Sequence, residues 1–290
     1  MKPAPFDYLA PATLDEALAA LARGAGDAVV LAGGQTLVPL LALRMSTPSV
    51  LIDINRIPEL AGISREGAAT RIGATTRQAA VLADPAVAGH TPGLTQATRF
   101  VGHHQTRNRG TIGGSICLAD PAAEYPATAV ALGAEIEVRS ASGARRIAAE
   151  DFFLGAYTTA LEPDEMVTAL RFPDWPAGTV TLVREVAPRP GDFALVGLVG
   201  AFALEAGKVQ RASIAWFGMG GAPVKSRKAE AAMAGRSLGE LDLQEAAQLA
   251  VSETDPFDDI HATAAYRRTV GARIFRKAVG ETLGLQRAAA

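Results

Sequence analysis

Two segments of the chain carry a residue pattern that could bind a phosphate. They are LAGGQTLVPLL, residues 31–41, and RNRGTIGGSICLADPAAEYP, residues 107–126. Each holds a glycine pair with hydroxyl side chains close by: Gly33, Gly34 and Thr36 in the first, and Thr111, Gly113, Gly114 and Ser115 in the second. Glycine lets the backbone approach a ligand closely, and successive N–H groups with hydroxyls beside them form an anion-binding concavity. Two such loops that converge could hold a diphosphate, whereas each loop alone could equally be a plain turn.

The better-known nucleotide motifs are absent from these segments. The sequence contains neither GxGxxG nor GxxxxGK[ST], which excludes a Rossmann fingerprint and a P-loop. Arg107 and Arg109 precede the second glycine pair and could neutralise a phosphate, although solvent or an ion pair is the commoner fate of loop arginines.

Candidates for acid–base or nucleophilic chemistry are few. Asp120 and Glu124 are four positions apart and could form a carboxylate pair, but Pro121 disfavours a helix between them, and loop solvation or turn capping is the alternative. Phe193, in PGDFALVG, begins an apolar strand and is a core aromatic by default. No GxSxG elbow, HExxH motif or paired cysteine motif occurs. None of these patterns marks a catalytic side chain.

Composition narrows the class of protein. Cys117 is the single cysteine, so an internal disulfide, an iron–sulfur cluster or a thiolate zinc site in this chain is excluded, and the four histidines suggest no bound metal. The formal charge of -2 offers no basic field for nucleic acid. No apolar run approaches the roughly 18 residues that span a bilayer, and the N-terminus has no segment like a signal peptide. We expect a soluble, cytoplasmic protein.

The first 55 or so residues form the element set that positions the first glycine pair. Thr13 and Glu16 fit a capping box at the start of a helix. A strand over 28–31, the Gly33-Gly34 turn, a short helix around 37–43 and a buried strand over 49–55 follow. This is a compact βαβ-like unit.

The rest of the chain mixes strands and helices without a regular βαβα run, which predicts an α+β fold. Up to residue 173 we expect a strand over 69–73, helices from Thr76 and over 93–102, mostly turn over 110–127, a helix over 128–132, a hairpin over 135–149 and a strand over 165–173. FPDWPAG, residues 172–178, marks a domain boundary because of its prolines and glycine. Beyond it we expect antiparallel strands over 179–187 and 192–221, with a turn at 205–208, and then helices over 226–235, 237–253 and 264–284.

Four motifs in this order resemble the FAD-binding medium subunit of the molybdenum hydroxylases, the family of carbon monoxide dehydrogenase and xanthine dehydrogenase. The motifs are LAGGQTLVPLLALRMSTPSVLIDIN, QTRNRGTIGGSICLADPAAEYPA, GAYTTALEPDEMVTALRFP and GDFALVG, and the resemblance covers essentially the whole chain. It implies a two-subdomain FAD-binding domain of the vanillyl-alcohol oxidase type over residues 1–175, divided at about 57/58. A C-terminal domain with an antiparallel sheet and a helical bundle would occupy residues 176–290.

The resemblance also implies a set of FAD-binding residues. The first loop would wrap the diphosphate and ribityl region, with Ala32, Gly33, Gly34, Gln35, Thr36 and Leu37. The second loop would hold the diphosphate with Thr111, Gly113, Gly114 and Ser115. Glu124 would bind a sugar hydroxyl, Val101 and Val167 would line the adenine or flavin pocket, and Phe193 would cover the isoalloxazine ring. Asp120 would also bind the cofactor. Ser115 and Glu124 replace the usual Asn and Asp. Glu185 lies near a position often held by Lys, and a carboxylate near the ring disfavours an anionic reduced flavin.

The function that the resemblance implies is electron transfer. A large partner subunit would carry the molybdenum cofactor, and a small one would carry two [2Fe–2S] clusters, in a dimer of heterotrimers. The FAD of this chain would take electrons from the clusters and pass them to an external acceptor. The alternatives are a free-standing FAD oxidoreductase with its own substrate pocket and an assembly subunit that has lost its flavin.

Overall fold

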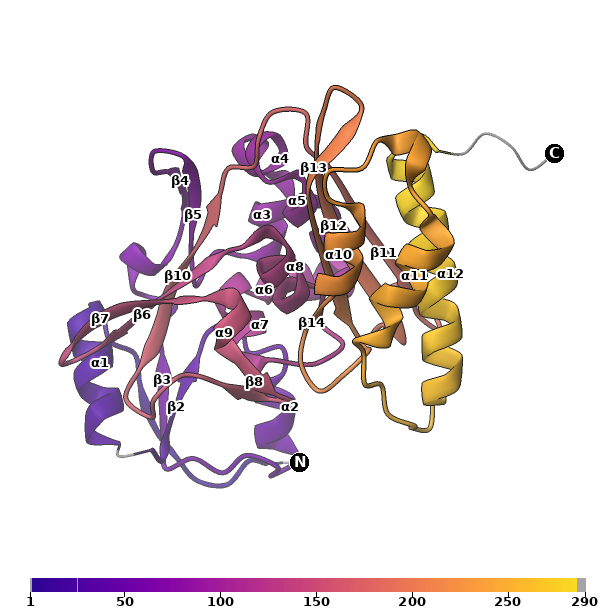
Figure 1. Cartoon of the computed structure of the whole chain (residues 1–290). Coiled ribbons are helices and arrows are strands. Elements are labelled where there is room, and N and C mark those ends of the chain that lie inside the picture. Colours follow the sequence, from indigo (N-terminus) through magenta and orange to yellow (C-terminus); the bar gives the residue numbers. More distant parts are fainter. Residues whose placement is uncertain (1, 25, 286–290) are drawn as a thin grey trace.

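The computed structural model describes residues 2–24 and 26–285, which form three main sheets and their covering helices (Figure 1). The N-terminal lobe is a parallel sheet of order β1-β3-β2. Its elements are β1 (Asp7–Leu9), α1 (Leu14–Arg23), β2 (Ala28–Leu31), α2 (Leu37–Ala42) and β3 (Val50–Asp53), followed by the short η1 (Pro58–Leu60). The predicted capping box is confirmed, since the Thr13 side chain accepts from the Glu16 N–H and the Glu16 carboxylate accepts from the Thr13 N–H.

The central part of the chain is an antiparallel five-stranded sheet of order β4-β5-β10-β6-β7. Its strands are β4 (Ile63–Arg65), β5 (Ala69–Gly73), β6 (Glu135–Ser140), β7 (Gly143–Ala148) and β10 (Met166–Pro173), and a small sheet pairs β8 (Phe153–Gly155) with β9 (Thr158–Thr159). The accompanying helices are α3 (Gln78–Ala83), α4 (Pro85–His90), α5 (Pro92–Phe100), α6 (His104–Arg109), α7 (Ile112–Leu118), α8 (Glu124–Leu132) and α9 (Ala149–Phe152). Apolar side chains of the sheet, such as Ile72 and Ile136, share one core with these helices.

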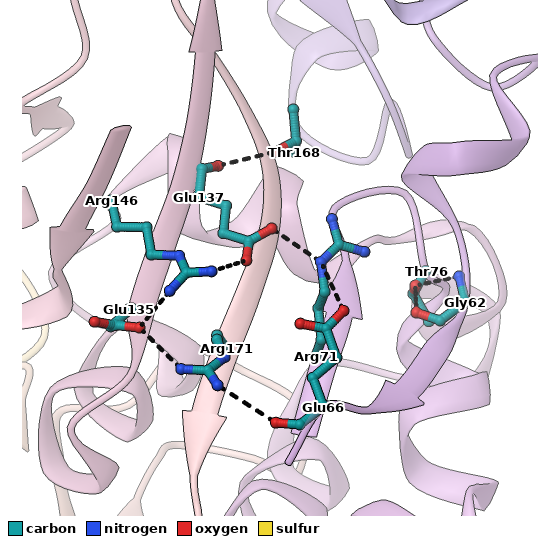
Figure 2. Close-up of polar contacts among 9 residues, drawn as sticks. All are labelled: Gly62, Glu66, Arg71, Thr76, Glu135, Glu137, Arg146, Thr168 and Arg171. Carbon is teal, nitrogen blue, oxygen red and sulfur yellow. Dashed lines mark hydrogen bonds and ion pairs between the residues drawn. The ribbon is translucent and has the colours of Figure 1, made fainter. Parts of the chain in front are cut away.

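The opposite face of this sheet is charged (Figure 2). Arg71 and Arg171 lie opposite each other on β5 and β10, and a glutamate bonds each of them: Glu137 lies 2.9 Å from Arg71, and Glu135 lies 3.4 Å from Arg171. Arg146 on β7 contacts both glutamates. Partly exposed ion pairs of this kind contribute modestly each, and they leave this face of the sheet polar while the helices cover the other face.

The C-terminal sheet has the order β11-β12-β13-β14 and packs on both faces. Its elements are β11 (Val180–Val186), β12 (Val196–Glu205), β13 (Lys208–Phe217), β14 (Val224–Lys225), α10 (Arg227–Met233), η2 (Leu238–Glu240), α11 (Leu243–Ser252) and α12 (Ala264–Thr282). Val199 and Ala201 face the core shared with α5 and α8, whereas Leu198 and Phe202 face α10–α12. The period-2 alternation of β12 thus joins this sheet to the central helices.

One expectation from the sequence is wrong. The segment over 110–127 is not mostly turn, because it contains α7, and α8 begins at Glu124 rather than near Thr128. Two glycines disfavour a helix, but Thr111 caps α7 and the Gly113 N–H donates to the Ala74 carbonyl. Every residue of α8 is buried, so tertiary packing decides its length, and Pro126 lies in the first turn, where proline is tolerated.

The other predicted strands and helices are present with shifts of a few residues at their ends, except that the helix expected over 237–253 is divided into η2 and α11. The helix expected from Thr76 begins at Gln78, and the short elements without a prediction are β1, η1, β4, β8, β9, β14, α4, α6 and α9. Within the described ranges, no helix combines the length and apolar character needed to cross a membrane.

Candidate functional site

One cavity of about 630 Å³ lies where the N-terminal lobe, helices α6 to α8 and the turn before β12 meet. All fifteen residues that the sequence singled out line it: Ala32, Gly33, Gly34, Gln35, Thr36, Leu37, Val101, Thr111, Gly113, Gly114, Ser115, Asp120, Glu124, Val167 and Phe193. Four different parts of the chain contribute them. The fold therefore brings the two glycine segments and the acidic residues to one place.

The first glycine segment presents unpaired backbone donors. Within the described part of the chain, no hydrogen bond is made by the backbone N–H groups of residues 33–36, and the Thr36 hydroxyl caps nothing. Gly34 has φ +71°, in the left-handed region that glycine adopts at little cost. Unpaired N–H groups facing a cavity are an anion-binding arrangement.

The second glycine segment uses its backbone donors internally. The N–H groups of Ile112 and Gly113 donate to the carbonyls of Thr76 and Ala74, and the Gly114 N–H donates to Thr111 Oγ1 at 3.1 Å. A Cβ on Gly113 would lie 2.7 Å from the Ala74 carbonyl oxygen. Glycine is therefore needed here so that α7 can pack closely against the chain just after β5.

The two segments touch each other directly. A Cβ on Gly33 would lie 2.6 Å from the Arg109 carbonyl oxygen and 2.9 Å from the Cα of Gly110. The convergence expected for a diphosphate cradle is thus present. Arg107 does not line this cavity, and its Nη1 donates to the carbonyls of Val101 and Gly102, whereas Arg109 lines a second cavity of about 310 Å³ beside the first loop.

The acidic residues lie where α7 gives way to α8: Asp120 is in the turn between them, and Glu124 is the first residue of α8. Asp120 is 9% exposed and accepts from the Ala122 N–H and from the Tyr157 hydroxyl. Burial, with smaller contributions from the charges of Glu185 and Asp120, raises the pKa of Glu124 to about 8. A protonated Glu124 would both donate and accept hydrogen bonds, as a sugar hydroxyl requires.

Glu185 lies on β11 and is not among the residues that line the cavity. Burial raises the pKa of its carboxyl to about 7, and its Oε2 has no hydrogen-bond partner among the described residues. The sequence placed this residue near the flavin ring. In the structure its effect on the cavity is exerted through Glu124.

Two further lining residues differ from the simplest expectation. Phe193 is not a core aromatic: it precedes β12, and 65% of its surface is exposed. Cys117 has exposed surface, yet burial raises the pKa of its thiol to about 12. Cys117 is one of the residues that line the cavity.

Sequence reasoning missed several lining residues, of which Gln78 is the clearest. It is 5% exposed, its N–H donates to the Gly110 carbonyl, and its Oε1 has no partner among the described residues. Apolar residues line another part of the cavity: Leu21, Val29, Val30, Leu161 and Met166. No local motif marks these positions, because they meet only in the folded chain.

The residues present fit a flavin dinucleotide. The unpaired donors of the first loop suit a diphosphate, the apolar walls suit planar rings, and the polar side chains between them suit sugar hydroxyls. Among the described residues, no group of three or more His, Cys, Asp or Glu side chains is placed to hold a metal ion.

Comparisons with known proteins cover nearly the whole chain. Residues 4–175 match the family "FAD binding domain in molybdopterin dehydrogenase", and residues 182–282 match the family "CO dehydrogenase flavoprotein C-terminal domain". The alpha subunit of the 6-hydroxypseudooxynicotine dehydrogenase complex of Paenarthrobacter nicotinovorans is 38% identical, over 98% of this chain and 95% of that protein. The carbon monoxide dehydrogenase medium chain of Hydrogenophaga pseudoflava is 33% identical, over 96% and 97%.

Solved structures agree with these relatives. A chain of carbon monoxide dehydrogenase from Hydrogenophaga pseudoflava superposes with a TM-score of 0.95 at 35% identity, covering 98% of this chain and 99% of that one. Quinoline 2-oxidoreductase from Pseudomonas putida 86 gives 0.93 at 34% identity, with the same coverage. The cavity, its two glycine segments and these likenesses lead to one conclusion: the chain belongs to the FAD-binding family of molybdopterin dehydrogenases, as the medium, FAD-carrying subunit of a molybdenum hydroxylase of the carbon monoxide dehydrogenase family.

Proposed function

We propose that this chain holds one FAD, non-covalently, in the 630 Å³ cavity and serves as the electron outlet of its complex. The observation that carries the proposal is the run of unpaired backbone N–H groups over residues 33–36 beside that cavity. Bound FAD would supply the redox chemistry. The side chains of this subunit would bind and orient it, exclude water and adjust its electronic surroundings.

Each wall of the cavity has a proposed part in binding. The first loop would hold the diphosphate through its backbone, and Thr36, Thr111 and Ser115 would add hydroxyl donors. Asp120 and Glu124 would bind polar hydrogens of the sugar or ring. Val101 and Val167 would contact the rings, and Phe193 would cover the isoalloxazine at the exposed mouth of the cavity.

The complex proposed around this chain has two further kinds of subunit. A large subunit would hold the molybdenum cofactor and oxidise the substrate, and a small subunit with two [2Fe–2S] clusters would pass electrons to this chain. The assembly would be a cytoplasmic dimer of heterotrimers that reduces an external acceptor. Support comes from the names of the relatives, which are medium chains or subunits of dehydrogenases. We also propose that the boundary between the FAD-binding and C-terminal domains lies at about 175/176.

Reconstitution with defined flavins tests the binding proposal. The purified chain should take up one equivalent of FAD and release it into the supernatant on acid precipitation. FMN lacks the second phosphate and the adenosine, so it should be retained much more weakly. Flavin that stays with the acid pellet, or FMN bound as tightly as FAD, would contradict the proposal.

A second reconstitution tests the role in electron transfer. The isolated chain, the chain with the iron–sulfur subunit, and the three subunits together are mixed with substrate, and flavin bleaching is recorded. Only the complete complex should reduce the flavin. Reduction by the isolated chain would favour the free-standing oxidoreductase, and a chain that takes up no flavin would favour the assembly subunit.

A further inference from the structure

Tyr157 lies in a backbone conformation that its side chain disfavours. It is the second of two residues, Ala156 and Tyr157, that connect β8 to β9, and its φ is +55°. Glycine or asparagine is usual in that left-handed region, because a bulky side chain meets its own backbone there. A turn needed only to join two strands would not favour tyrosine at this position.

The strained turn is bonded to the loop that carries the acidic residues of the cavity. The Tyr157 N–H donates to the Ala119 carbonyl at 3.0 Å, and the Tyr157 hydroxyl donates to Asp120 Oδ2 at 3.2 Å. Ala119 is itself left-handed, with φ +51°. Two non-glycine residues with left-handed backbone, Ala119 and Tyr157, are therefore joined by a hydrogen bond. Such strain concentrates where the surrounding structure fixes a functional geometry.

Asp120 is held from several sides, and Tyr157 is the side chain among the described residues that bonds its carboxylate. The other oxygen, Oδ1, accepts from the Ala122 N–H. The next residue, Pro121, accepts from the Gly218 N–H at 2.7 Å, which ties the loop to the end of β13. The Pro121 contact fixes where the loop lies, whereas the Ala122 N–H and the phenol each hold one oxygen of the carboxylate.

The difference in exposure between the two residues is informative. Tyr157 is 63% exposed and does not line the cavity, whereas Asp120 is 9% exposed and lines it. Partial burial, the larger cause, and proximity to the carboxylate raise the pKa of Tyr157, so the phenol remains a hydrogen-bond donor. It bonds Asp120 from outside the cavity and leaves the inner side of the carboxylate to a ligand.

We propose that Tyr157 is a positioning residue for the flavin site: its hydroxyl orients Asp120 so that the carboxylate accepts a hydrogen bond from an O–H or N–H group of the bound FAD. The inference rests on the proposed binding of FAD in this cavity and extends it to a residue outside the cavity wall. Tyr157 touches no ligand in this arrangement and acts through Asp120 alone.

The test is a double-mutant cycle on the full-length chain, read as the Kd for FAD of the flavin-free protein. The variants are Tyr157→Phe, Asp120→Ala and the two combined. Tyr157→Phe should raise the Kd between about 2- and 10-fold, the range expected for one hydrogen bond. In the Asp120→Ala background the same change should have no effect, because its acceptor is gone. Tyr266→Phe, at another exposed tyrosine, is the matched control and should change the Kd by less than about twofold.

A further variant separates positioning from folding. Tyr157→Gly relieves the left-handed strain and also removes the hydroxyl. The Tm of the flavin-free protein should hold or rise while the Kd for FAD rises at least as much as in Tyr157→Phe, and the visible circular dichroism of the bound flavin should change in both variants. A merely structural role would lower the Tm instead.

Three outcomes overturn the proposal. A Kd unchanged in Tyr157→Phe removes the role, and additive effects in the cycle show that Tyr157 does not act through Asp120. A fall in Tm in step with the loss of affinity assigns the residue to folding. A wild-type chain that binds no FAD overturns the proposed function and this inference together, whereas normal wild-type binding with any of the three outcomes overturns this inference alone.

Discussion

The two glycine segments look alike in sequence and do different work in the fold. Among the described residues, the backbone N–H groups of residues 33–36 have no hydrogen-bond partner, whereas those of Ile112, Gly113 and Gly114 are bonded to protein. The first segment therefore has backbone donors free for an anion. The second is built to pack, since a Cβ on Gly113 would meet the Ala74 backbone. A glycine pair marks close approach of a backbone, and only the partners of its N–H groups show whether a ligand or the protein itself comes close.

The contrast also extends to the residues on the C-terminal side of each segment. The first segment runs into the apolar helix α2, whereas the second continues through α7 to Asp120, in the turn that follows, and to Glu124, the first residue of α8. Backbone donors and acidic side chains therefore reach the cavity from different segments of the chain. A dinucleotide lying between them would meet donors at its diphosphate and acceptors at its hydroxyl and N–H groups.

The largest effect is expected where the two segments touch. Gly33→Ala places a methyl group against the backbone of Arg109 and Gly110, which cannot retreat as a side-chain tip could. The flavin-free protein should lose about 3 kcal/mol of unfolding free energy, and FAD should no longer be retained because the segments are forced apart. Urea unfolding and flavin content check this.

Gly89→Ala is the control for that variant. A Cβ on Gly89 meets nothing within 4 Å, and the residue lies in α4, where alanine is the better helix former. It should bind FAD normally and gain up to about 1 kcal/mol. A Gly33→Ala protein that keeps stoichiometric FAD would show that the contact between the segments is not needed.

The acidic side of the contrast predicts a pH dependence. The pKa of Glu124 is about 8 in the folded chain and near 4.5 when unfolded. Between these values the unfolded chain has released the proton that the folded chain keeps, so unfolding free energy falls as pH rises from about 4.5 to 8. The fall should be on the order of 2 kcal/mol, since water in the open cavity relieves part of the desolvation.

Glu124→Gln should remove much of that slope and make the flavin-free protein more stable than wild type at pH 8. Thermal melts at pH 5, 6, 7 and 8 measure it. The pKa of Glu185, raised to about 7 by burial, contributes a second slope that ends nearer neutrality, and Glu185→Gln isolates it. Parallel pH profiles for wild type and Glu124→Gln would mean that Glu124 ionises normally in the folded chain.

A smaller effect comes from exchanging the threonine of each segment. Thr111 Oγ1 accepts from the Gly114 N–H and caps α7, so Thr111→Val should cost about 1 kcal/mol of unfolding free energy. Thr36 caps nothing, so Thr36→Val should leave stability within about 0.5 kcal/mol and weaken FAD binding up to about tenfold. Chemical denaturation should show the larger loss of stability in Thr111→Val, and flavin titration should show the larger loss of affinity in Thr36→Val. The same response from both would erase the distinction between the segments.

Much of the fold could be predicted from local signals. The alternating strand over 196–205, the buried strand over 50–53 and the Thr13 cap all depend on spacing within a few residues. The fifteen candidate residues lie far apart in sequence and line one cavity. They could be predicted together only because the resemblance to a family supplied them. Their contacts with FAD remain a prediction.

The features that escaped prediction depend on partners distant in the chain. Helix α7 forms in spite of two glycines because Ala74 and Thr76 accept its first N–H groups. The role proposed for Tyr157 cannot be inferred before the fold brings it beside Asp120, 37 residues earlier. Gln78 joins the cavity through the Gly110 carbonyl. Propensity and periodicity describe neighbours along the chain, so they are blind to such pairs.

The smallest perturbation is alkylation of Cys117, the single cysteine of the chain. It lies on the second segment and lines the cavity. Burial raises its thiol pKa to about 12, so little thiolate exists at pH 8 and alkylation by iodoacetamide should be slow. Below pH 12 the rate should rise by about tenfold per pH unit, in proportion to the thiolate. The flavin-free protein should gain one adduct by intact-mass spectrometry. Bound FAD should slow the reaction further, because Cys117 lines the cavity. Thr36→Val supplies the control: without flavin it should react like wild type, and at limiting FAD it should be less protected. Equal rates with and without saturating FAD would place the flavin away from the second segment and leave the first as its only contact.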